Sequence, residues 1–284
     1  MVGTQEFFSP MAFDFLWEAM RIGELPYPLP VRSHGATEEE RHVLRQRTHA
    51  ELRARGIRDR HGRLEPHVEE WLSLLARPTI SLDALHIPDF QRPPIAVLAA
   101  TDGREGVVAI QDSAGILVRP APAEGLVSTV VDLLPPGRRG TEFSITLPLD
   151  EALRTTPSRV AVPGGSSVAE SRGEEGEPQR RDRPHPTVRT SLSGRVADPR
   201  EAYASLSGQP RLRGGQLAVN SRNELGGKRR SRVLTWFDTA SGRYLSLSRA
   251  GADGREWVTI SPAEPKTLRT RLNEMVASLS DVVR

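Results

Sequence analysis

Two short motifs recur in this chain at almost the same separation, and this repetition constrains the fold more than any other feature. Pro122-Ala123-Glu124 and Pro262-Ala263-Glu264 each stand between a predicted strand and a predicted helix, and they are 140 positions apart. Gly103-Arg104 and Gly242-Arg243 each occupy a turn between predicted strands, 139 positions apart. Matches at nearly one offset in the same structural context indicate an internal duplication, because repeated units are built from the same supersecondary elements.

A polar stretch over residues 157–187 separates the two repeats. It consists largely of Gly, Ser, Glu, Arg and Pro, and few of its side chains could be buried. Such a composition cannot offset the entropy of ordering, so we predict a disordered linker. The chain then divides into an N-terminal half (1–156), the linker and a C-terminal half (188–284), and we expect the halves to form one domain.

Helix-start signals occur in both halves. Ser9-Pro10 and Asp198-Pro199 each combine a capping side chain with a proline in the first turn. Thr37 with Glu40, and Ser261 with Glu264, have the spacing of a capping box. These signals predict helices from Pro10 to about residue 22, from Thr37 to Gly56, from Pro66 onward, and at the C-terminal end of the chain.

Short alternating segments predict the strands. They lie near residues 95–100, 107–111, 116–119 and 142–147 in the first half, and 216–220, 233–238, 244–248 and 256–260 in the second. Helices, strands and a further helix follow one another in both halves, so the sequence predicts the α+β class. The run Leu234-Thr235-Trp236-Phe237 is apolar on both faces, which is typical of a central strand.

Alternation along the second-half strands predicts one apolar and one polar face of the sheet. The apolar face collects Leu217, Val219, Leu245, Leu247, Val258 and Ile260, with Phe143, Ile145 and Leu147. The polar face collects Gln216, Ala218, Asn220, Tyr244, Ser246, Ser248, Trp257 and Thr259, with Ser144 and Thr146. This polar face is either the solvated side of an antiparallel sheet or a docking surface, because Tyr and Trp among small polar groups are typical of interfaces.

Charge is distributed unevenly between the two parts of the chain. Residues 188–284 hold 17 basic against 9 acidic side chains, whereas residues 1–187 hold 22 against 27. The run Lys228-Arg229-Arg230-Ser231-Arg232 would be either a solvated loop or a contact for an anionic partner or a nucleic acid. Arginine supplies 37 of the 39 basic residues, a bias typical of a GC-rich genome.

No pattern of a catalytic or cofactor-binding site is present in the sequence. The chain has no cysteine, and it lacks the nucleophile-elbow, Walker-type, dinucleotide-binding and zinc-protease motifs. His42 and His49 share a predicted helix, but about two turns separate them, too far for direct ligation of one metal. We therefore expect no enzyme activity, no metal and no cofactor. Without a signal peptide or membrane-spanning run, we expect a cytoplasmic protein.

Several motifs in order resemble one protein family. Gly23-Glu24-Leu25-Pro26-Tyr27-Pro28-Leu29 is followed by His34-Gly35-Ala36-Thr37, Leu52-Arg53-Ala54-Arg55-Gly56 and the helix that contains Trp71. Later come Gly214-Gly215-Gln216-Leu217, Leu234-Thr235-Trp236-Phe237-Asp238-Thr239, Gly242-Arg243-Tyr244-Leu245 and Trp257-Val258-Thr259-Ile260-Ser261-Pro262-Ala263. In order and spacing this series is similar to the EspG family of ESX (type VII) secretion-associated proteins of actinobacteria. It spans essentially the whole chain except the linker, which departs from the compact pattern of the family.

The resemblance implies both a fold and a function. The fold would be a central antiparallel sheet with helical subdomains in a quasi-twofold arrangement. The protein would be a cytosolic chaperone that binds the helical tip of the PPE partner in PE–PPE pairs, with no catalytic residues. Partner contacts in the family have no fixed motif, so the candidates here come from the polar face and from a loop before a strand. They are Tyr244, Ser246, Ser248, Trp257 and Thr259, with Phe90, Gln91 and Arg92. The alternative is a nucleic-acid-binding regulator that uses the basic C-terminal half.

Overall fold

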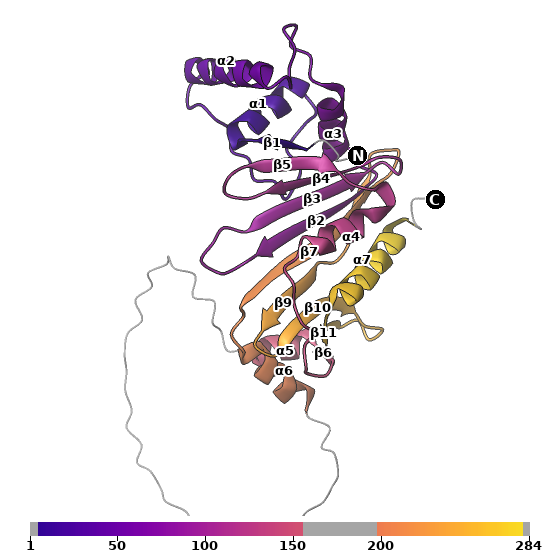
Figure 1. Ribbon diagram of the computed structural model, residues 1–284. Coiled ribbons are helices and arrows are strands. Elements are labelled where there is room, and N and C mark those ends of the chain that lie inside the picture. Colours follow the sequence, from indigo (N-terminus) through magenta and orange to yellow (C-terminus); the bar gives the residue numbers. More distant parts are fainter. Residues whose placement is uncertain (1–4, 156–197, 281–284) are drawn as a thin grey trace, which may run out of the picture.

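The computed structural model describes residues 5–155 and 198–280 (Figure 1), so the predicted linker lies outside the described residues. The first part of the chain forms β1 (Glu6–Phe8), α1 (Pro10–Met20), α2 (Glu38–Ala54), α3 (Pro66–Ala76), β2 (Ile80–Ile87), β3 (Ile95–Thr101), β4 (Gly106–Gln111), β5 (Ile116–Pro120), η1 (Ala123–Gly125), α4 (Leu126–Asp132), β6 (Ile145–Pro148) and α5 (Leu149–Thr155). The second part forms α6 (Pro199–Gly208), β7 (Arg213–Arg222), β8 (Lys228–Arg230), β9 (Leu234–Thr239), β10 (Gly242–Ala250), β11 (Glu256–Pro262) and α7 (Pro265–Ser280).

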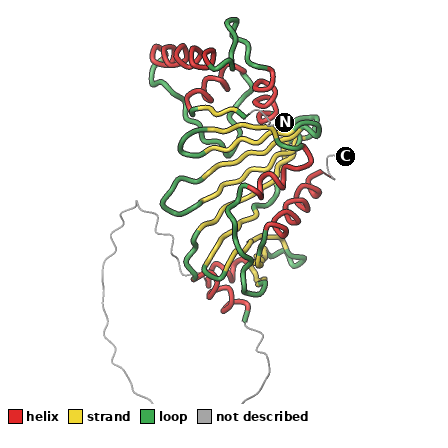
Figure 2. Tube along the Cα trace, in the orientation of Figure 1, coloured by secondary structure: helices red, strands yellow, loops and turns green. Residues whose placement is uncertain are grey.

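The strands of the described residues form one sheet, in the order β1-β5-β4-β3-β2-β7-β9-β10-β11-β6, with β8 pairing to β7 beside this path. Every neighbouring pair is antiparallel. Helices α1–α3 gather at the β1 end of the sheet, and α5 and α6 gather at the β6 end (Figures 1 and 2). The α+β class with a central antiparallel sheet and helical subdomains is confirmed.

The order of elements repeats about the centre of the sheet. β2, β3, β4 and β5 lead into α4, and β7, β9, β10 and β11 lead into α7. The two series meet where β2 pairs with β7, from Ile80 opposite Ser221 to Ile87 opposite Gly214. Edge strands β1 and β6 complete the two ends, so the predicted duplication is confirmed. Strand β6 and helix α5 stand at the far end beside β11, although both fall within residues 1–156.

Local sequence signals place the starts of α1, α2 and α6. The Ser9 hydroxyl accepts a hydrogen bond from the Ala12 amide (3.1 Å), and the Asp198 carboxylate accepts one from the Arg200 amide (2.9 Å). The Thr37 hydroxyl accepts from the Glu40 amide as predicted, but the Glu40 carboxylate reaches back to the Ala36 amide. These side chains satisfy amides that the first helical turn leaves without partners.

The predicted capping box at Ser261 and Glu264 is wrong. Ser261 and Pro262 instead belong to β11, where they pair with Leu245 and Tyr244. Helix α7 begins only at Pro265. Pairing with β10 satisfies the backbone of Ser261, so tertiary contacts override the local helix-start signal.

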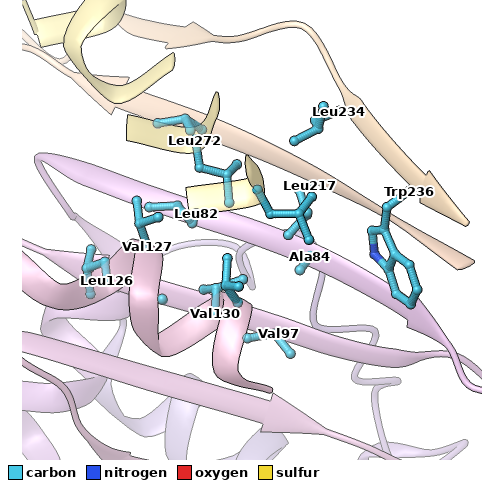
Figure 3. Packing of buried hydrophobic residues seen from close by; sticks show 14 of the residues in the cluster. Leu82, Ala84, Val97, Leu126, Val127, Val130, Leu217, Leu234, Trp236 and Leu272 are labelled. Carbon is cyan, nitrogen blue, oxygen red and sulfur yellow. The ribbon is translucent and has the colours of Figure 1, made fainter. Parts of the chain in front are cut away.

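Helices α4 and α7 cover the middle of one sheet face, here called the α7 face (Figure 3). Leu126, Val127 and Val130 of α4 and Leu272 of α7 pack on strand residues that include Leu82 and Leu217. Leu234 and Trp236 of β9 are fully buried in this cluster, whereas Phe237 is buried on the opposite face. This confirms that the β9 segment is a central strand with two apolar faces.

Two further clusters lie on the opposite face, here called the open face, one at each end. At the β1 end, α3 packs on β3, β4 and β5 and α1 packs beside β1, in a cluster that includes Phe13, Leu72 and Leu98. At the β6 end, α5 and α6 contribute Ala152 and Leu206 to a cluster on β9, β10, β11 and β6. In the part of the chain that the structure describes, the helices therefore cover the two ends of the open face and leave its middle uncovered.

A close approach of the backbone explains Gly215, near the start of β7. A Cβ atom on Gly215 would lie 2.3 Å from the Leu85 carbonyl oxygen and 2.6 Å from the Trp236 indole nitrogen. A backbone oxygen cannot move aside as a flexible side chain can, so only glycine fits where Trp236 packs against the β2–β7 pair.

Candidate functional site

The register between β10 and β11 divides the polar face predicted from the sequence. Ser246 lies opposite Ile260, and Ser248 lies opposite Val258. Directly paired residues of antiparallel strands share a face, so Ser246 and Ser248 lie with Val258 and Ile260 on the open face. Leu247 lies opposite Thr259, which puts Thr259 and Trp257 on the α7 face. The predicted grouping of all five candidates on one face is therefore wrong.

Two aromatic residues differ from the prediction in their exposure. Tyr244 lies on the open face but is fully buried, stacked on Phe237 with ring centroids 5.7 Å apart. Its hydroxyl accepts a hydrogen bond from the Glu142 amide. Phe143, predicted to face the core, is 91% exposed because it precedes the first residue of β6. Tyr244 is thus a core residue in this structure.

A strip of small and polar side chains remains accessible on the open face. Thr235 lies directly opposite both Gln216 and Ser246, so the three residues form one row across β7, β9 and β10. Gln216 is exposed, and Thr235, Ser246 and Ser248 are half-buried. We call these four residues the central strip. Sequence alternation identified the two serines, but joining them to Gln216 and Thr235 required the register.

The central strip lies between the two helix-covered ends of the open face. Leu85, which pairs with Gln216, is packed against the cluster beneath α1 and α3. Ile260, which pairs with Ser246, belongs to the cluster beneath α5 and α6. Among the described residues, the arrangement is a polar sheet surface with helical subdomains on both sides.

The second group of candidates lies in the connection between β2 and β3. Phe90 is 60% exposed, and Gln91 and Arg92 are exposed as well. Asp89 shapes this loop by accepting hydrogen bonds from the Gln91 amide (2.9 Å) and pairing with the Arg92 side chain (3.1 Å). The loop begins at the end of β2, where Ile87 pairs with Gly214. An exposed phenylalanine there provides an apolar side chain near one end of the central strip.

A buried ion cluster joins β7, β9 and β10 near the start of β7. Asp238 accepts two hydrogen bonds from the Arg243 guanidinium (2.7 and 2.9 Å) and one from Arg213 (2.6 Å). Burial raises the pKa of Asp238, but the hydrogen bonds from the two arginines more than offset this and leave the pKa below its usual value. Arg243 also donates to the Pro135 carbonyl (2.8 Å), so the cluster ties the α4–β6 connection to β9 and β10.

His86 introduces a pH dependence beside this cluster. Its ring stacks on Trp236 with centroids 5.4 Å apart, and its Nδ1 has no hydrogen-bond partner among the described residues. Burial lowers the pKa of His86 below its ordinary value of 6.5. Arg213 and Arg243 lower it further, while a hydrogen bond with the Gly214 backbone and the charge of Asp238 act in the opposite direction.

We expect the free energy of unfolding to decrease as the pH falls below about 6.5, because the unfolded chain then takes up a proton that folded His86 resists. The slope is at most about 1.4 kcal/mol per pH unit for each such proton. Above that pH the contribution is fully present. Urea unfolding from about pH 8 to about pH 5 measures the effect. His86→Phe should reduce the slope without abolishing it, because burial also lowers the pKa of His49. Equal slopes for the variant and the parent would contradict the assignment.

The first three residues of the basic run, Lys228–Arg230, form strand β8 rather than a loop. Arg230 pairs with both carboxylate oxygens of Asp83 (2.5 and 2.8 Å). Arg232 pairs with both carboxylate oxygens of Glu256 (2.7 and 2.8 Å). Two of the four cations in the run are therefore neutralised within the chain, which weakens the case for a nucleic-acid surface. Within residues 5–155 and 198–280, no helix is long and apolar enough to cross a membrane.

Comparisons with known proteins agree with this architecture. The model of the EspG family matches residues 9–274. A solved structure of the Mycobacterium tuberculosis type VII secretion system chaperone EspG5, in complex with a PE25-PPE41 dimer, is similar with a TM-score of 0.65 and 16% sequence identity. That similarity covers 96% of this chain and 96% of the EspG5 chain. No curated protein matches. With a family match over nearly its whole length and the same fold, this chain belongs to the EspG family.

Proposed function

We propose that this chain is a cytoplasmic, non-enzymatic chaperone of type VII secretion that binds the helical tip of the PPE-type protein in a PE–PPE pair. Membership of the EspG family is the observation that carries the proposal. The structural neighbour EspG5 was solved with a PE25-PPE41 dimer, which supports a partner of the same kind. The uncovered middle of the open face offers a surface on which an elongated helical tip fits.

The proposed interface consists of the central strip and the loop with Phe90, Gln91 and Arg92. The strip supplies hydroxyl and amide groups that pair with polar atoms of a helix tip, and Phe90 supplies an exposed aromatic anchor. Covering an apolar tip would keep the substrate from associating with itself. Trp257 and Thr259 lie on the opposite face of the sheet, so this proposal rests on Ser246 and Ser248 among the predicted strand residues.

Co-expression with the PE–PPE-type pairs of the same genome tests the proposal. We expect affinity capture of this chain to retain one pair, and the complex to remain intact through size exclusion at moderate salt. Binding through phosphate contacts would instead weaken steeply as salt is raised. If no pair is retained and the chain binds DNA at low salt, the chaperone function is contradicted and the nucleic-acid-binding regulator is favoured.

A further inference from the structure

A groove lies between the N-terminal helical subdomain and the β7–β8 hairpin. It has a volume of about 500 Å³ and joins three segments: the loop from Glu24 to Tyr27, the end of α3 near Leu75, and the hairpin itself. A smaller hollow of about 280 Å³ continues it and shares Glu24, Ala76, Arg222 and Lys228. The central strip has no residue in either lining, so the groove is a separate surface.

Two like charges face each other across the hairpin at this groove. Arg222 lies directly opposite Lys228 in the β7–β8 pair, and both line the groove. Neither forms an ion pair with a carboxylate among the described residues, including Glu24, which lines the same groove. Like charges directly opposite one another in a sheet are destabilising. An anion held between them would remove that repulsion.

Arg230 contributes in a different way, because Asp83 already neutralises it. Its guanidinium lies 5.3 Å from the centroid of the Tyr27 ring, which is 57% exposed. The contact fixes the position of Tyr27 at the mouth of the groove. Arg222, Lys228 and Arg229 of the groove form no ion pair with a carboxylate among the described residues, but Arg229 alternates with Lys228 and Arg230 along β8 and so points to the other side of the hairpin. The cations that can hold one ligand in the groove together are therefore Arg222 and Lys228.

The opposite wall of the groove is apolar. Leu25 and Pro26 from the loop, with Leu75 and Ala76 from the end of α3, line it beside Tyr27. A free phosphate would contact only the cations and leave this wall bare. A peptide that carries both a carboxylate and an apolar side chain would use both parts of the groove.

We propose that this groove binds an acidic peptide segment. A Glu or Asp carboxylate of the peptide bridges Arg222 and Lys228, and a neighbouring apolar side chain packs on Leu25, Pro26 and Ala76. This site is independent of the proposed chaperone interface and does not rest on it. Its partner is a protein segment recognised by charge and one anchor, as in other acidic-motif sites.

Fluorescence anisotropy with the full chain tests the site. The probe is a labelled peptide of alternating glutamate and leucine, and its matched control replaces every glutamate with glutamine. We expect the acidic peptide alone to bind. The double variant Arg222→Gln/Lys228→Gln should weaken its binding by about tenfold or more, as loss of a charge-assisted contact predicts. Its melting temperature should be equal to or above that of the parent, because the repulsion is gone.

The control variant Arg47→Gln/Arg104→Gln removes two exposed charges elsewhere in the N-terminal part of the chain. It should leave peptide binding unchanged. An equal loss of peptide affinity in both double variants would overturn the site, because the loss would then follow from the change in net charge and not from these two residues. Binding of the glutamine peptide as tightly as the acidic one would overturn it as well. If inorganic phosphate competes as effectively as unlabelled peptide, the peptide proposal is contradicted and the groove is a site for a small anion.

Discussion

Replacing Asp238 with alanine is expected to lower the free energy of unfolding by about 3–5 kcal/mol, as breaking a buried ion pair on one side does. The substitution leaves Arg243, whose side chain is 1% exposed, and the half-buried Arg213 without their carboxylate. It also loosens the attachment of the α4–β6 connection, because Arg243 is the residue that joins Asp238 to the Pro135 carbonyl. Urea unfolding at neutral pH measures the loss.

An exposed ion pair provides the control for that experiment. Asp150 pairs with Arg154 and Arg255, and its side chain is 54% exposed. Asp150→Ala should leave the unfolding transition unchanged within error, because solvent screens exposed pairs. The double variant Asp238→Ala/Arg243→Leu should be less destabilised than the two single changes together, because no buried charge is then left unpaired. Equal effects of Asp238→Ala and Asp150→Ala would contradict a buried, fully bonded cluster.

Placing a cation on the central strip is expected to abolish most binding of a PE–PPE-type partner. Gln216 is the exposed residue at the β7 end of the strip, so Gln216→Arg should fold normally while adding a bulky charge to the proposed contact. We expect about a hundredfold weaker binding, or about 2.7 kcal/mol, the loss typical of a change at the centre of an interface. Ser248→Arg should act in the same direction. Titration calorimetry with the purified pair measures both.

Thr259→Arg serves as the matched control, because Thr259 is a half-buried residue of the neighbouring strand β11 on the α7 face. Its partner affinity should equal that of the parent. Retained binding in Gln216→Arg together with loss in Thr259→Arg would move the interface to the face that holds Trp257. Loss in all variants with lowered melting temperatures would indicate damage to the sheet, so each variant is compared at equal folded fraction.

Much of the architecture could be predicted because it depends on local signals. Ser9, Thr37 and Asp198 begin helices by bonding amides within a few residues, and no distant contact is needed. The β9 segment was predicted as a central strand because it is apolar on both faces. Strand β2 was not predicted. It is the central partner of β7, but its polar residues Ser81, Asp83 and His86 conceal it, since all three are buried by packing and pairing that the sequence does not display.

The candidate site was predicted less well, because the face on which a strand residue lies depends on the pairing register. Side chains alternate between faces along a strand, so a shift of one residue in the pairing of β10 with β11 exchanges the faces of every residue that follows. The connection over residues 251–255 sets that register, with Asp253 bonding the Arg255 amide and the Trp257 indole. Its geometry put Ser246 beside Ile260 rather than beside Thr259.

By itself the sequence determined the class, the duplication, most of the helix starts and the family resemblance, since each rests on short-range patterns or on motif order. Only the tertiary structure decided which residues share a face, where the helices leave the sheet uncovered, and which cations remain unpaired. Those properties depend on pairing between residues far apart in the chain. The cations of the hairpin illustrate this. Arg230 is neutralised because Asp83 of β2 lies beside it, whereas Arg222 lies opposite another cation, Lys228.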